Sequence, residues 1–115
     1  MSARTRGWVE SWDRVKTLPE DELKVYVLKK CRNGFQVAKK PGRDQRDAWV
    51  TILAEADKTK DQLSPLAMSV VGYVRDQLGA EGYDFELNLD DTGGVAYAEV
   101  HFKTLKKKAL AEVRT

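Results

Sequence analysis

The side chains best suited to acid–base chemistry lie near the C-terminal end of the sequence, around its one histidine. His101 belongs to an alternating segment that predicts a β-strand, in which it stands beside Glu99 and across from Asp84 of the preceding strand. An imidazole next to a carboxylate is the arrangement of a general base. The same arrangement is more typical of an ion pair between strands at a protein surface. We therefore assign no catalytic residue.

The Asp, His and Cys residues of the chain give little indication of a metal site or of a reactive thiol. Asp90 and Asp91 adjoin a glycine-containing turn, where adjacent carboxylates usually serve the turn rather than bind a hard cation. One histidine and one cysteine, Cys31, cannot form an ordinary His/Cys zinc site. We expect Cys31 to be a reduced, half-buried apolar residue; the alternative is a thiolate whose pKa is lowered by its basic neighbours. The sequence thus predicts no metal, no cofactor and no enzyme.

Composition and length favour a single domain in a reducing compartment. A single cysteine can form no intramolecular disulfide, which favours a reducing, intracellular location such as the cytoplasm. No apolar run follows the charged N-terminus, so we expect neither a signal peptide nor a membrane span. The 115 residues suit a single domain over 1–115, in which 104–115 is a basic tail or a short helix.

Apolar residues at helical spacing recur along the first two-thirds of the chain. A capping-box pattern at Thr17 and Glu20, and a Ser64-Pro65 pair, mark the starts of two helical segments. Asn33-Gly34 supplies a left-handed stop, and 35–43 is expected to be extended. The four predicted helices cover about 7–16, about 18–32, about 44–57, and 64 to Gly79 or Gly82.

After Gly82 the period changes from helical to two, which predicts two strands, about 83–90 and 95–103, joined by a turn. A register in which Leu89 faces Ala96 pairs apolar residues throughout and opposes Glu86 to Glu99. The predicted fold is therefore α+β. It has four helices, or five if the tail is helical, and a C-terminal two-stranded antiparallel β-hairpin packed on the helical body.

The segment 64–102 resembles the recognition helix and wing of winged-helix domains. The matching features are the helix over 68–78, the glycines that follow it and a glycine-containing wing. The resemblance covers about a third of the chain and implies DNA recognition through the helix. This helix departs from that pattern in carrying only Arg75 as a cation, and the wing is acidic.

The charges of the chain are segregated, although 20 Lys and Arg residues nearly balance 18 Asp and Glu residues. The segments 29–46 and 103–114 are basic. The segment 80–99 contains six Asp and Glu residues and neither lysine nor arginine. Such blocks are either solvated faces or binding surfaces.

Two functional hypotheses follow. The first is a small non-enzymatic protein that acts through protein–protein contacts, in the manner of small regulators or inhibitors such as those of phages and mobile elements; a protein partner or a homodimer fits it, and a membrane does not. Its candidate contact residues are Asp84, Glu86, Tyr97 and Glu99. The alternative is a domain that contacts the phosphates of DNA or RNA. Its candidate residues are Lys39, Lys40, Arg43, Arg46, Lys106, Lys107 and Lys108.

Overall fold

Three α-helices and a three-stranded antiparallel sheet make up the computed structural model, which describes residues 3–39 and 47–104 and the side chains of 6–39 and 47–104. The elements in chain order are α1 (Ala3–Val15), α2 (Glu20–Ala38), β1 (Ala48–Ala56), the short 3-10 helix η1 (Lys60–Gln62), α3 (Pro65–Ala80), β2 (Phe85–Thr92) and β3 (Val95–Phe102). β3 is central and pairs with β1 on one side and β2 on the other. The fold is α+β, but the expected four or five helices with a two-stranded hairpin are wrong.

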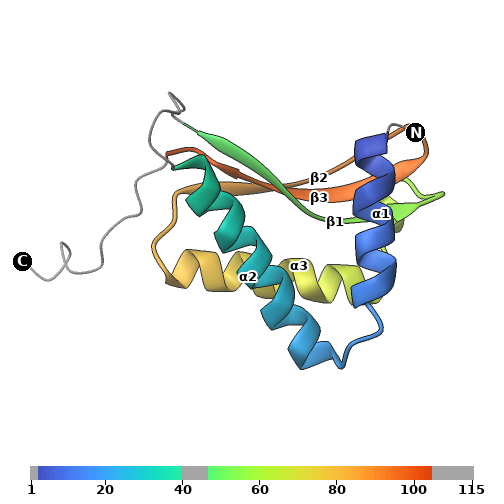
Figure 1. Cartoon of the computed structure of the whole chain (residues 1–115), viewed down its shortest axis with the longest axis horizontal. Coiled ribbons are helices and arrows are strands. Elements are labelled where there is room, and N and C mark those ends of the chain that lie inside the picture. Colours follow the sequence, from blue (N-terminus) through green and yellow to red (C-terminus); the bar gives the residue numbers. More distant parts are fainter. Residues whose placement is uncertain (1–2, 40–46, 105–115) are drawn as a thin grey trace, which may run out of the picture.

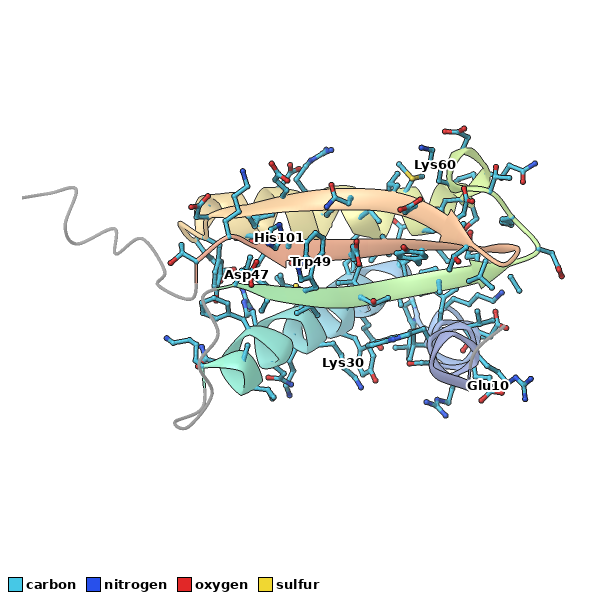
Figure 2. All side chains as sticks on the ribbon, turned by 90° about the horizontal axis from the view of Figure 1, so that it is seen from above. Glu10, Lys30, Asp47, Trp49, Lys60 and His101 are labelled. Atoms are coloured by element: carbon cyan, nitrogen blue, oxygen red, sulfur yellow. The ribbon has the colours of Figure 1, made fainter. Side chains whose placement is uncertain are left out.

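Helices α2 and α3 pack side by side on one face of the sheet (Figure 1). The β3 side chains that face them are fully buried in the core: Ala96, Ala98, Val100 and Phe102. α1 instead stands beside the edge strand β1, and its Val9 packs on Ala54 and Val95, which point to the opposite face. Among the described residues, no helix lies over the rest of that opposite face, which is turned toward the viewer in Figure 2.

The predicted helix over 44–57 is wrong, because Ala48–Ala56 forms strand β1. The register of β1 shifts between Thr51 and Leu53, so that Ile52 has no partner on β3. This bulge breaks the alternation of buried and exposed residues and leaves four consecutive buried positions, from Ile52 to Glu55. A short continuous run of this kind cannot be distinguished from a buried helix by its period.

Helix α2 continues past the predicted stop at Asn33-Gly34 and ends at Ala38, so the start of the predicted extended segment 35–43 is helical. Gly34 has a different purpose, since a Cβ built on it would lie 2.9 Å from the side chain of Val50. The glycine lets α2 approach β1 closely. Residues 40–46, with the Pro-Gly turn predicted there, lie outside the described residues.

Of the two predicted helix starts, the one at Ser64 is confirmed and the one at Thr17 is wrong. Ser64 caps α3 as predicted: its hydroxyl accepts from the Ala67 amide, and Pro65 is the first helical residue. The predicted capping box of Thr17 and Glu20 is wrong. α2 begins at Glu20 with Pro19 at the cap position, and the Thr17 hydroxyl instead donates to the carbonyl of Arg14, 3.0 Å away.

The β2–β3 hairpin is present, but its register differs by two residues from the prediction. Gly93 and Gly94 have φ angles of 57° and 80° and form the whole two-residue loop, so Thr92 pairs with Val95. His101 therefore faces Glu86 rather than Asp84, and Glu99 faces Asn88 rather than Glu86. A shift of two preserves the face on which each side chain lies. Of the segment 104–115, only Thr104 is among the described residues.

The carboxylate of Glu55 connects α1 and the start of α3 to the sheet. Glu55 is 8% exposed and points to the helix-covered face, opposite Ala96. It accepts hydrogen bonds from Trp12 Nε1 of α1 at 3.0 Å and from the amide and hydroxyl of Ser64, both at 2.7 Å. Lys58 Nζ lies 3.2 Å away. The contact with Trp12 fixes the position of α1 beside β1.

Candidate functional site

We call the sheet surface opposite α2 and α3 the open face. Because side chains alternate along a strand and paired residues point to the same side, the register identifies its members. They are Trp49, Thr51, Ala54 and Ala56 of β1, Val95, Tyr97, Glu99 and His101 of β3, and Glu86, Asn88, Asp90 and Thr92 of β2. The face is therefore rich in aromatic and acidic side chains.

Trp49 and His101 form a stacked pair on the open face (Figure 2). Their ring centroids lie 3.8 Å apart with an interplanar angle of 3°. The imidazole Nε2 lies 3.0 Å from a carboxylate oxygen of Asp47, which precedes β1. His101 is thus held by Asp47 and not by Asp84, which lies before β2. Trp49 remains 53% exposed even with one ring face against the imidazole.

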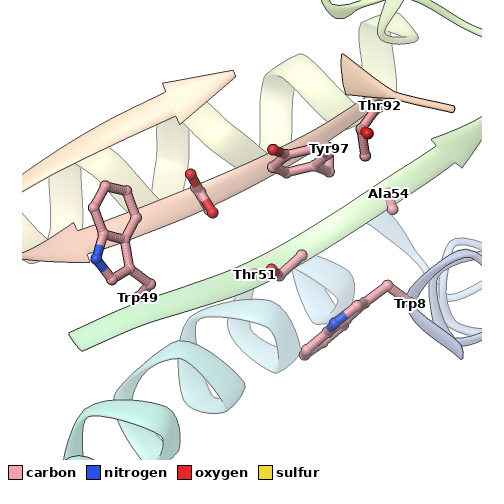
Figure 3. Close-up of a pocket in the computed structure, with 7 residues that line it drawn as sticks. Trp8, Trp49, Thr51, Ala54, Thr92 and Tyr97 are labelled. Atoms are coloured by element: carbon pink, nitrogen blue, oxygen red, sulfur yellow. The ribbon is translucent and has the colours of Figure 1, made fainter. Parts of the chain in front are cut away.

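A cavity of about 320 Å³ opens on this face between α1 and the sheet (Figure 3). Its lining residues are Trp8, Trp49, Thr51, Ala54, Thr92, Tyr97 and Glu99. Thr51 and Ala54 are small and form its floor on β1, whereas the larger aromatic side chains form its walls. Trp8 comes from α1, so the position of this helix determines the width of the cavity.

The carboxylates of the open face differ in their partners. Glu86 lies 2.8 Å from Lys103 Nζ, and this hydrogen bond lowers the pKa of Glu86. Glu99 is half-buried and makes no hydrogen bond or ion pair with any residue that the structure describes. Burial, and then the charge of Asp90, raise the pKa of Glu99, and the smaller effect of His101 opposes them. The wall of the cavity therefore contains a carboxylate with no ion-pair partner among the residues that the structure describes.

Three of the predicted protein-contact residues, Glu86, Tyr97 and Glu99, come together on the open face. The fourth, Asp84, is exposed before β2, and its carbonyl accepts from the amide of Lys103. Trp49 is not among the predicted site residues, because an apolar residue in a predicted helix is expected in the core. Trp8 is not among the predicted site residues either, since nothing in the sequence places α1 beside β1.

Of the seven predicted phosphate-binding residues, Lys39 is the one that the structure describes. Lys39 is exposed at the end of α2, and its Nζ lies 5.3 Å from the centre of the Phe35 ring. The other six residues of that prediction lie outside the described residues: Lys40, Arg43, Arg46, Lys106, Lys107 and Lys108. Nucleic-acid binding through them stays a prediction.

The remaining reactive groups serve the fold. Cys31 is fully buried, and burial raises the pKa of its thiol to about 12, which contradicts the alternative of an activated thiolate. Asp91 accepts a hydrogen bond from the amide of Lys60 at 2.8 Å and so joins the hairpin to η1. Within residues 6–39 and 47–104, no three His, Cys, Asp or Glu side chains gather as metal ligands.

The described helices include none with the length and apolar character needed to cross a membrane. No protein-family model matches the chain, and no curated protein or solved structure matches it either.

Proposed function

We propose that this protein is a small non-enzymatic binding module of the regulator or inhibitor type, which docks a protein partner on the open face of its sheet. The observation that carries the proposal is the exposure of Trp49. Trp49 is 53% exposed on the edge strand β1, and beyond the part that α1 covers, no described helix lies over the face to which it points. An exposed aromatic residue grouped with others on an uncovered surface is typical of a contact site.

The surroundings of Trp49 favour a binding surface. Tryptophan and tyrosine are enriched among the residues that dominate interface energies, because they bury a large area with few rotatable bonds. The stacking of Trp49 on His101 fixes the indole before any partner arrives, which lowers the entropy cost of docking. Tyr97 is the second aromatic residue available on the same face.

The charge of the open face suggests the character of the partner. Glu99 and Asp90 add negative charge beside Trp49 and Tyr97, and neither forms an ion pair with a described residue. A basic protein segment would be complementary to this surface, and complementary charge increases both the association rate and the specificity.

Affinity capture with matched variants tests the proposal. Trp49→Ala and Glu99→Lys alter the open face, whereas Val25→Ala and Met68→Ala remove exposed apolar side chains from α2 and α3, where they are 57% and 42% exposed. We expect a protein captured by the parent chain to be retained by both helix variants and lost from both open-face variants. Equal capture by all four variants would refute the docking surface.

The same experiment separates the proposal from the alternative. Nuclease treatment before capture removes any DNA or RNA that bridges protein and bait. Loss of capture after nuclease treatment would favour nucleic-acid binding over protein docking. The same holds if capture falls steeply with salt and the binding of a labelled oligonucleotide to the chain falls in the same way.

A further inference from the structure

We infer that the cavity on the open face binds the guanidinium group of an arginine side chain from the partner. The inference rests on the proposed function, and it names the chemistry that the docking surface recognises. Its basis is the arrangement of three aromatic side chains and one carboxylate around a single hollow, with Trp8, Trp49, Tyr97 and Glu99 all in its lining (Figure 3).

The size of the cavity suits one side chain. At about 320 Å³ it lies at the lower end of the range of roughly 300–1,000 Å³ typical of small-molecule pockets. The hollow exists because β1 carries the small residues Thr51 and Ala54 between Trp49 and the α1 wall. Larger residues at these two positions would fill it.

The chemistry of the lining selects a cation. Aromatic ring faces carry partial negative charge and attract cations within about 6 Å, tryptophan most strongly. Glu99 adds a carboxylate, and no described residue forms an ion pair with it, although His101 on the same face interacts with it electrostatically. An entering cation would thus supply the ion-pair partner that no described residue gives this half-buried carboxylate.

A guanidinium fits this lining better than an ammonium. It is planar and weakly hydrated, so it stacks on aromatic rings at a small desolvation cost. Its forked N–H groups can donate two parallel hydrogen bonds to the carboxylate of Glu99. The apolar stem of the arginine side chain can lie over Thr51 and Ala54.

Three blocked tripeptides test the assignment by NMR titration of the full chain. They have the form acetyl-Gly-X-Gly-amide, where X is arginine, lysine or citrulline, the neutral isostere of arginine. We expect arginine to shift the Trp49 indole N–H and the Glu99 amide saturably. Citrulline should bind at least about tenfold more weakly, because it keeps the shape and loses the charge. Trp12 provides an internal control, since its indole is 2% exposed and bonded to Glu55.

A matched pair of substitutions identifies the carboxylate responsible. Glu99→Gln should weaken arginine binding about tenfold, which corresponds to the loss of one charge-assisted contact. Glu10→Gln removes an exposed carboxylate of α1 that does not line the cavity, so the affinity should remain unchanged. Equal binding of citrulline and arginine, equal effects of the two substitutions, or tighter binding of lysine than of arginine would overturn the inference.

The chain's own lysines are the competing occupant. If Lys106→Ala, Lys107→Ala and Lys108→Ala together shift the Trp49 resonance in the absence of any peptide, the cavity holds this chain's own tail, and the inference fails.

The outcomes also separate the two proposals. Loss of protein capture in Trp49→Ala without arginine binding removes only the cation site. Arginine binding with unaltered capture removes only the docking function.

Discussion

Substitution of Glu55 by glutamine should destabilise the protein substantially, although the two side chains have nearly the same shape. The two carboxylate oxygens accept from four donors: Trp12 Nε1, the Ser64 amide, the Ser64 hydroxyl and Lys58 Nζ. A glutamine offers one oxygen and one amide nitrogen, so the nitrogen must face two of these donors. The Ser64 amide can only donate, so the glutamine oxygen must stay on its side. The glutamine nitrogen then faces Trp12 Nε1 and the Ser64 hydroxyl.

The cost follows from that geometry. The Ser64 hydroxyl can rotate and accept, but Trp12 is only 2% exposed and its N–H is left without an acceptor. An orphaned buried donor costs about 1–3 kcal/mol, and the bonds that remain lose their charge assistance. We expect a loss of about 3 kcal/mol from a total of about 5–15 kcal/mol typical of small domains. The melting temperature should fall by roughly 10 °C.

Urea denaturation of the parent and Glu55→Gln measures this loss, with Glu10→Gln on the exposed side of α1 as the control. Trp12→Phe removes the orphaned donor. In the Trp12→Phe background, Glu55→Gln should lower the free energy of unfolding by about 1–2 kcal/mol less than in the parent. This difference is the coupling energy that a double-mutant cycle measures. A loss below about 0.5 kcal/mol, equal to that of a surface substitution, would show that Glu55 does not hold a buried donor in place.

The same substitution has a defined pH dependence. Burial raises the pKa of Glu55, but the hydrogen bonds from Ser64, Trp12 and Lys58 outweigh burial, so the pKa lies below its ordinary value of 4.5. A carboxyl group whose pKa is lowered on folding stabilises the protein above its unfolded pKa, and this stabilisation is lost as the pH falls through the folded pKa. The difference between the parent and Glu55→Gln should therefore shrink below pH 4.5. A difference that grows toward acid would contradict the assigned direction.

Two further substitutions and one reagent test other parts of the structure. Gly34→Ala should cost about 1–3 kcal/mol, because its methyl group would lie 2.9 Å from Val50, whereas Gly7→Ala, with nothing within 4 Å, should be neutral or stabilising. Chemical denaturation measures both, and equal effects would show that α2 does not approach β1 closely. Cys31 should be inert to a thiol reagent at pH 8 and react only on unfolding, since its pKa is about 12 and it is fully buried. Rapid labelling of the folded chain would place the thiol at the surface instead.

The sequence predicts best where each local signal has one meaning. The Ser64-Pro65 start of α3 and the alternation of β2 and β3 are such signals, and both match the structure. Because a strand has a period of two, Glu86 and Glu99 remain on one face even though the predicted register is wrong by two residues. Part of the open face was therefore foreseeable without the tertiary structure.

The errors arise where one local signal has two physical uses. Gly34 is suitable for a helix stop and equally for close approach of a helix to a strand, and only the position of Val50 distinguishes the two. In β1, the bulge at Ile52 produces apolar spacing that a helix would also produce. That one misassignment concealed both the third strand and the exposure of Trp49. The cavity depends further on the docking of α1 beside β1, which no local pattern encodes.

Amide hydrogen exchange of the free chain and of its complex with the captured partner maps the contact surface without substitutions. If the partner docks on the open face, exchange should slow in β1 and β3 around Trp49, Tyr97 and Glu99 and should stay unchanged on the outer side of α2 around Val25. Protection confined to α2, with exchange around Trp49 unaltered, would contradict docking on the open face.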